Sequence, residues 1–153
     1  DKVTPQDVDA LIIPGGYGNV LTLTRYNRTN NEYELDETLK RLIRGIYVRG
    51  KPIGALGYGT FLLGLALGKI ASPILTPGEE TEYIEQLKKN GVMFTKVPPD
   101  EVVFDDFNNL FSASGINPEV SILKGAKGIE NLVDNLIEAK KVRRSSDERN
   151  RIR

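Results

Sequence analysis

Short apolar runs alternate along this chain with segments whose apolar residues recur at helical spacing. Residues 8–13 (VDALII) form one such run, and residues 14–16 (PGG) close it, which predicts a strand buried on both faces and ending in a turn. Residues 34–50 carry leucine and isoleucine at helical spacing, with acidic residues first and arginines later. A second apolar run follows at residues 52–56. Strand, helix and strand in this order predict a parallel α/β sheet.

The rest of the chain extends the same pattern. An apolar helix is expected at residues 60–70 and an amphipathic helix at residues 79–91. A short extended segment follows at residues 92–97, and residues 101–115 are expected to form two short strands around an Asp-Asn turn. A last helix is expected at residues 118–141. Two glycines, Gly125 and Gly128, are expected to interrupt the last helix. The polar, Asn-rich residues 26–31 predict a loop.

The length and charge pattern predict one domain with a distinct tail. A chain of 153 residues is long enough for one compact core and short for two. The formal net charge is zero, yet residues 140–153 carry seven cations and two anions. We therefore expect an α/β domain at residues 1–139 and a basic extension at residues 140–153.

The composition excludes several kinds of site. The sequence contains no cysteine and no histidine. This absence rules out disulfides, thiolate catalysis, Cys/His zinc sites and any Ser-His or Cys-His nucleophile pair. Adjacent Asp105 and Asp106 are better explained by a hairpin turn than by a cation site, because neighbouring strand residues point to opposite faces. We predict neither a metal nor a cofactor.

The stretch at residues 50–60 (GKPIGALGYGT) has the form of a nucleophile elbow, a sharp strand-to-helix turn with small neighbours. Its central position is Gly57, which has no reactive side chain. If the sheet is parallel, this turn and the one after residues 8–13 share its carboxyl edge, where open α/β sheets bind ligands. The candidate anion pocket consists of backbone N–H donors at Gly15, Gly16 and Tyr58, with Tyr17 and Thr60 as lining side chains.

These segments resemble a known family. DALIIPGGYG, the GKPIGAL strand with its elbow, and the closing pattern from TKVPPDEVVFDD to KGIENLVDNLIE are similar to the Parkinson-associated deglycase (DJ-one)/PfpI superfamily, and within it to the ElbB-like glyoxalase-related branch. The elbow is also similar to that of class I glutamine amidotransferases. The resemblance implies a flavodoxin-like three-layer α/β sandwich that lacks its N-terminal strand-helix-strand unit.

The same resemblance assigns the site position by position. The reactive cysteine of the family corresponds to Gly57, and its oxyanion donors correspond to Gly15, Gly16 and Tyr58. The chain is therefore expected to be a catalytically inactive pseudoenzyme, retained as a structural or interaction subunit of a larger assembly. Family membership further suggests a mitochondrial location, with the cytoplasm as the alternative.

Two other functions stay open from the sequence. One is a glyoxalase, deglycase or amidohydrolase that uses a different nucleophile, for which the Thr60 hydroxyl is a poor candidate because no histidine can take its proton. The other is a module that binds a small anion on the glycine turns.

The basic tail is the candidate partner contact. Clustered arginines donate bidentate hydrogen bonds to phosphates, so RNA or anionic lipid is one expectation, and an acidic protein neighbour is the other. The interleaved Asp147 and Glu148 and the absence of aromatic residues weaken the nucleic-acid interpretation. The residues concerned are Arg143, Arg144, Arg149, Arg151 and Arg153.

Overall fold

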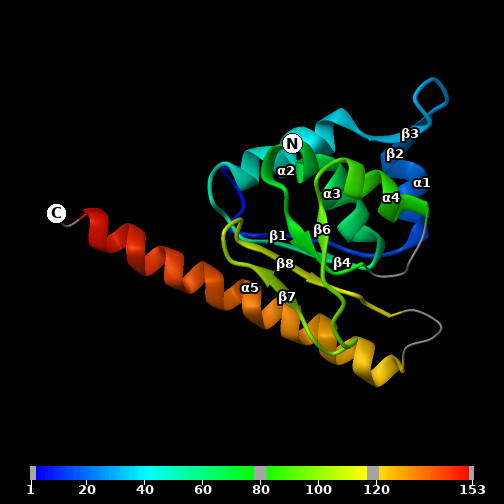
Figure 1. Ribbon diagram of the computed structural model, residues 1–153. Coiled ribbons are helices and arrows are strands. Elements are labelled where there is room, and N and C mark those ends of the chain that lie inside the picture. The colour runs from blue at the N-terminus through cyan, green and yellow to red at the C-terminus, as the bar shows by residue number, and fades with distance from the viewer. Residues whose placement is uncertain (1–2, 78–81, 117–120, 152–153) are drawn as a thin grey trace.

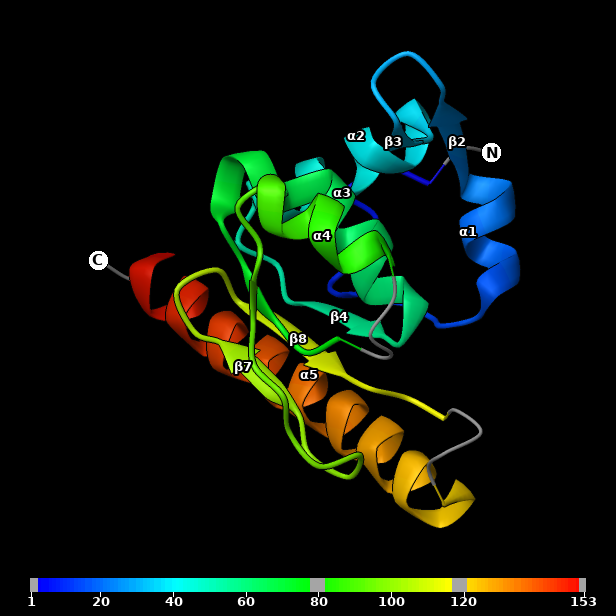
Figure 2. The same ribbon diagram turned by 45° about the vertical axis from the view of Figure 1, so that its right-hand side comes forward.

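The described chain is a three-layer α/β sandwich. The computed structural model describes residues 3–77, 82–116 and 121–151, with the backbone alone for residues 143–151. A mainly parallel sheet forms the middle layer, helices α1 to α4 cover one face, and helix α5 covers the other (Figures 1 and 2). The predicted flavodoxin-like fold class is confirmed.

The elements follow one another in α/β order. The strands are β1 (Leu11–Ile13), β2 (Thr24–Asn27), β3 (Glu32–Leu35), β4 (Ile53–Leu56), β5 (Ile74–Leu75), β6 (Met93–Phe94), β7 (Val103–Asp105) and β8 (Leu110–Ala113). The helices are α1 (Tyr17–Leu23), α2 (Glu37–Tyr47), α3 (Tyr58–Ala71), α4 (Glu82–Lys89) and α5 (Ile122–Arg151).

The main sheet has the strand order β1-β4-β8-β7. Strand β4 pairs in parallel with β1 on one side and with β8 on the other, whereas β7 runs antiparallel to β8. Because β1, β4 and β8 are parallel, their carboxyl ends meet at one edge of the sheet, as predicted for the two glycine turns. Strands β2 and β3 form an antiparallel hairpin outside this sheet, and β5 and β6 form a short parallel pair.

The core is centred on β4 and α3. All four residues of β4 are buried, and α3 is apolar around most of its circumference because it lies between the sheet and helices α2 and α4. On the opposite face, Leu132 and Leu136 of α5 pack on Leu56 and Phe111. A Cβ added to Gly54 would lie 2.5 Å from a methyl carbon of Leu136, so glycine at this position lets α5 approach β4 closely.

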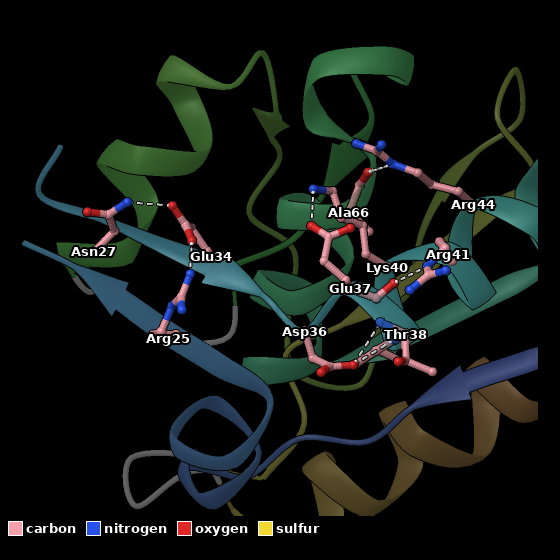
Figure 3. Close-up of polar contacts among 11 residues, drawn as sticks. Arg25, Asn27, Glu34, Asp36, Glu37, Thr38, Lys40, Arg41, Arg44 and Ala66 are labelled. Atoms are coloured by element: carbon pink, nitrogen blue, oxygen red, sulfur yellow. Dashed lines mark hydrogen bonds and ion pairs between the residues drawn. The ribbon is translucent and has the colours of Figure 1, made fainter. Parts of the chain in front are cut away.

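The predicted loop is confirmed for residues 28–31, which form the turn of a hairpin, but the strands on either side of this turn were not predicted, and the next helix begins later than expected. Residues 26–31 were expected to form a loop, but β2 includes Tyr26 and Asn27, and β3 begins at Glu32. The strands form because Tyr26 and Tyr33 face each other across the pair, with ring centroids 5.0 Å apart. Helix α2 begins after Asp36, not at residue 34, because the Asp36 carboxylate accepts hydrogen bonds from the backbone N–H groups of the first turn (Figure 3).

Helix α5 runs without the predicted interruption at Gly125 or Gly128. A Cβ added to Gly125 would lie 2.6 Å from a side-chain carbon of Ile116. A Cβ added to Gly128 would lie 2.2 Å from the Pro99 carbonyl oxygen. These glycines therefore permit close approach of neighbouring loops and do not break the helix. The short helix α1 was not predicted, and residues 79–81 and 118–120 of two predicted helices lie outside the described residues. None of the helices described, α5 included, is long and apolar enough to cross a bilayer.

Candidate functional site

The turn between β4 and α3 has the backbone geometry of a nucleophile elbow. Gly57 caps α3 with φ 48° and ψ −121°, a conformation that residues with a side chain rarely adopt. Its N–H donates to the Ala113 carbonyl at 3.0 Å, which fixes the turn against the end of β8. The first turn of α3 contains no acidic residue, so the partial positive charge of the helix N-terminus is not neutralised there by a carboxylate of the same turn.

Three glycine turns meet at this edge of the sheet. The position that a Cβ of Gly57 would take lies 4.0 Å from the Cα of Gly15 and 3.2 Å from the Ser114 carbonyl oxygen. A Cβ on Gly115, after β8, would lie 3.5 Å from the Gly57 nitrogen. The structure therefore brings together the ends of β1, β4 and β8.

The glycine two positions after the elbow is required sterically. A Cβ at Gly59 would lie 2.3 Å from the Ile13 carbonyl oxygen and 2.8 Å from that of Pro14. These acceptors are backbone atoms at the end of β1, so they cannot turn aside as a side chain would. Gly59 thus allows α3 to start directly against β1, as the elbow motif requires.

The turn after β1 is held by hydrogen bonds from the Asn19 side chain. Gly16 has φ 110° and precedes α1, and the Asn19 amide donates to the carbonyl oxygens of Gly15 at 3.0 Å and Pro14 at 3.3 Å. Within the described part of the chain, neither Gly15 nor Gly16 donates a backbone hydrogen bond outside the regular elements. The N–H groups predicted as anion donors at these two positions are therefore not used by the turn itself.

Two hydroxyl groups lie beside the elbow, in different states. Thr60 is 4% exposed, and its hydroxyl donates to the Gly57 carbonyl at 2.7 Å, so it serves the first turn of α3. The Ser114 hydroxyl oxygen is buried and has no hydrogen-bond partner among the described residues. Ser114 was not singled out by the sequence, although its place directly after a strand parallel to β4 was the available signal.

A cluster of tyrosines flanks the elbow. The rings of Tyr17 and Tyr58 lie 5.6 Å apart, and the Tyr83 hydroxyl donates to the Tyr17 hydroxyl at 3.5 Å. Burial raises the pKa of Tyr83, and its hydrogen bond to Tyr17 adds to the effect, so the phenol stays neutral over the physiological range. Tyr17 and Tyr58 were predicted at the site, whereas Tyr83 was missed because its helix is distant in sequence.

The acidic pair is part of a turn. Asp105 is buried and accepts hydrogen bonds from the Ile74 N–H at 2.8 Å and from the Asn108 N–H at 3.1 Å. Asp106 is exposed, as expected for neighbours on opposite faces. In the described ranges, no group of three or more acidic residues is arranged to hold a metal ion.

The structure does not describe the side chains of the tail arginines. Arg143, Arg144, Arg149 and Arg151 lie on the last part of α5, where the structure describes the backbone and not the side chains. Arg153 lies outside the described residues. Their assignment as a partner contact remains a prediction.

Several solved structures have a similar fold. An isoprenoid biosynthesis protein with an amidotransferase-like domain from Ehrlichia chaffeensis superposes with a TM-score of 0.77 and 26% identity, over 90% of this chain and 62% of that one. DJ-1 of Schizosaccharomyces pombe superposes with a TM-score of 0.52 and 21% identity, over 92% of this chain and 66% of that one. This chain therefore spans less than two thirds of the length of either protein. No protein-family model matches the sequence.

The resemblance inferred from the motifs and the observed topology agree with these superpositions. The match covers 90% of this chain, whose topology combines a strand-to-helix elbow, a glycine turn after β1 and the parallel pairing of β1, β4 and β8. The chain thus has the DJ-1/PfpI fold, which is that of the class I glutamine amidotransferase-like proteins.

Proposed function

We propose that this chain is a catalytically inactive member of its fold, a pseudoenzyme that acts as a structural or interaction subunit. The observation that carries the proposal is the elbow: the strained turn, the close glycine contacts and the helix N-terminus are present, but Gly57 supplies no nucleophile. Proteins with this fold are typically enzymes, so the absence of the side chain is informative about function.

The hydroxyl groups described beside the elbow do not supply the missing chemistry. The Thr60 hydroxyl is engaged with the Gly57 carbonyl, and the sequence has no histidine to take a proton from it or from Ser114. A hydroxyl without a base is a weak nucleophile at neutral pH. The engaged Thr60 hydroxyl and the absence of histidine therefore favour an inactive site over an enzyme with a substituted nucleophile.

The catalytic half of the proposal is tested by enzyme assays on the purified chain. With methylglyoxal and with glutamine as substrates, we expect no turnover from the wild type, Thr60→Ala or Ser114→Ala. Gly57→Cys should be alkylated by iodoacetamide faster than a free cysteine, because the α3 N-terminus stabilises a thiolate. Turnover by the wild type that Thr60→Ala or Ser114→Ala abolishes would establish an enzyme and overturn the proposal.

The interaction half is tested by the state in which the protein is recovered. We expect it to copurify with a larger assembly at fixed stoichiometry, and truncation after Ala139 to release it, since the basic tail is the proposed contact. A mitochondrial location belongs to the same proposal and is read from fractionation of the source cells. Recovery of the protein as a free monomer or homodimer alone would contradict the subunit role.

A small-anion module is the second candidate, favoured by one observation. The N–H groups of Gly15 and Gly16 are not used by the described turn, and Gly15 lies beside Gly57 at the α3 N-terminus. Titration with phosphate, monitored by amide chemical shifts, would move these two signals selectively if this function holds. Shifts spread over lysine-rich surfaces instead would indicate nonspecific binding.

A further inference from the structure

A cavity lies between the β2–β3 hairpin and helix α4, and Gly57, Tyr58 and Gly59 of the elbow are not among its lining residues. Its volume is about 420 Å³, within the range of small-molecule sites. The hairpin supplies Tyr26, Asn30, Asn31 and Tyr33, and α4 supplies Tyr83. Nothing in the proposed function uses this cavity, so its chemistry is an independent question.

The walls of the cavity are tied together by hydrogen bonds. The Gln86 side chain donates to the Tyr33 carbonyl at 2.7 Å and accepts from the Tyr33 N–H at 2.8 Å, which joins α4 to β3. On the hairpin, Arg25 and Asn27 both donate to the Glu34 carboxylate, as Figure 3 shows. A site formed by such linked elements needs little ordering when a ligand binds.

Aromatic rings form a concave corner in the cavity. The ring of Tyr33 lies 5.0 Å from those of Tyr26 and Tyr83, at interplanar angles of 57° and 76°. Tyr26 remains 44% exposed, so one ring is accessible from solvent. Aromatic faces carry partial negative charge and attract the weakly positive C–H groups of a saturated ring.

The charges around the cavity largely cancel. Glu85 is ion-paired with Lys88 at 2.9 Å, and the remaining charged lining residues, Glu32 and Lys89, have opposite signs. A cation would gain from the carboxylates but be repelled by Lys89, and the reverse holds for an anion. The lining therefore favours a neutral ligand.

The lining of the cavity offers both hydrogen-bond donors and hydrogen-bond acceptors. The amide oxygen of Asn30 accepts from the Glu32 N–H at 3.2 Å, and that of Asn31 accepts from the Tyr26 hydroxyl. These bonds use the amide oxygens and leave the NH₂ groups as donors, while the carboxylates of the lining are acceptors. A ligand hydroxyl both donates and accepts, and so matches a lining that offers both.

We propose that this cavity binds a neutral polyhydroxylated ring, of monosaccharide or disaccharide size, stacked against Tyr26 and Tyr33. The amide groups of Asn30 and Asn31 donate to its hydroxyls. Tyr83 lines this cavity and also contacts the elbow tyrosines Tyr17 and Tyr58, so it joins the two regions.

Saturation-transfer NMR on the full chain tests the proposal, with methyl glucoside, methyl galactoside and cellobiose as probes. We expect transfer to the ring C–H protons of at least one probe. Tyr26→Ala should weaken its binding about tenfold or more, since the stacking face is lost, whereas Tyr26→Phe should stay within about threefold. Asn31→Gly keeps the left-handed backbone (φ 58° at Asn31) and should weaken binding about threefold to tenfold through loss of the amide.

The controls separate the alternatives. Val48→Ala removes an exposed apolar side chain away from the cavity and should leave binding unchanged. Circular dichroism of each variant checks folding, and Asn31→Gly provides the test if Tyr26→Ala does not fold. No transfer to any probe, or binding that is insensitive to both variants, overturns the proposal. Selective binding of choline or of phosphate would instead assign the cavity to a charged ligand and also overturn it.

Discussion

The two ends of the central sheet are held together in different ways. At the amino ends of β4 and β8, Asp105 and Asn108 form a buried network: the Asn108 amide donates to Asp105 at 2.8 Å and accepts from the Tyr47 hydroxyl at 2.8 Å. At the carboxyl ends, the glycine turns approach one another closely, backbone against backbone, and the buried Ser114 hydroxyl has no hydrogen-bond partner among the residues that the structure describes.

This difference separates stability from function within one sheet. Buried polar groups in native proteins are nearly always hydrogen-bonded, so the fully bonded end is what folding alone requires. The carboxyl end has a glycine in a conformation that other residues rarely adopt, and a buried hydroxyl with no partner among the described residues, features that cluster at ligand sites. The contrast supports a site at the elbow even though the nucleophile is absent.

The largest expected effect is at the bonded end. Asp105→Ala should lower the free energy of unfolding by about 3 kcal/mol, because the Ile74 and Asn108 N–H groups lose their acceptor in the interior. Urea denaturation measures the change. Its matched control, Asp106→Ala, removes an exposed carboxylate and should change stability by no more than about 0.5 kcal/mol. Equal effects of the two variants would contradict the description of this end.

Gly59→Ala tests the close backbone contact at the elbow end. Its Cβ would lie 2.3 Å from the Ile13 carbonyl oxygen, so the start of α3 must shift, at a cost of about 2 kcal/mol. Gly18→Ala is the control, because nothing lies within 4 Å of its Cβ position on α1. Alanine there should raise stability by about 0.5 kcal/mol through helix propensity. Thermal unfolding of the pair would show whether the contact or the loss of glycine matters.

Two serines that are two positions apart, Ser112 and Ser114, give a closer test of what a bonded and an unbonded hydroxyl contribute. Ser112→Ala removes the acceptor of the buried Thr76 N–H at 2.9 Å and should cost about 1 to 2 kcal/mol. Ser114→Ala removes a hydroxyl that has no partner within the described ranges and should leave stability unchanged or raise it by up to about 1 kcal/mol. If Ser114→Ala is as destabilising as Ser112→Ala, the hydroxyl is satisfied and the contrast between the two ends weakens.

The smallest effect is expected at an exposed pair that belongs to neither end. Hydrogen bonds from Asn27 and then Arg25 lower the pKa of Glu34 below its ordinary value, so the folded state favours the ionised carboxylate. This stabilisation is present above the ordinary glutamate pKa of about 4.3 and is lost as the pH falls through the lower folded value. The urea midpoint of Glu34→Gln should therefore lie slightly below that of the wild type at pH 7 and converge with it at pH 3.

Much of the fold could be predicted because local pattern and tertiary structure agree. The runs at residues 8–13 and 52–56 both contain strands of the parallel sheet, as predicted. Burial on both faces holds for β4, which is a central strand, but was wrong for the first run, because β1 is the edge strand and leaves Ile12 40% exposed. The strands β2 and β3 were missed because the polar, Asn-rich composition of this segment is typical of a loop. The pairing of Tyr26 with Tyr33, which stabilises the hairpin, exists only in the folded chain.

The site was predictable in its backbone and not in its side chains. Gly57 and Gly59 are recognisable because the elbow motif requires small residues at fixed spacing. Ser114 and Tyr83 belong to elements distant in sequence, and their approach to the elbow follows from the pairing of β8 with β4 and from the packing of α4 on α3. Periodicity carries no information on such contacts.

Helix α5 has one more consequence, for anything attached to the end of the chain. Its 30 residues correspond to a rod about 45 Å long, and Figure 1 shows its carboxyl half projecting beyond the sheet. A fluorophore or protein tag fused there would be attached to a rigid helix, at a fixed distance and direction from the sheet, and not to a flexible linker. Energy transfer from a donor at that end would thus work as a ruler for whatever docks against the rest of the molecule.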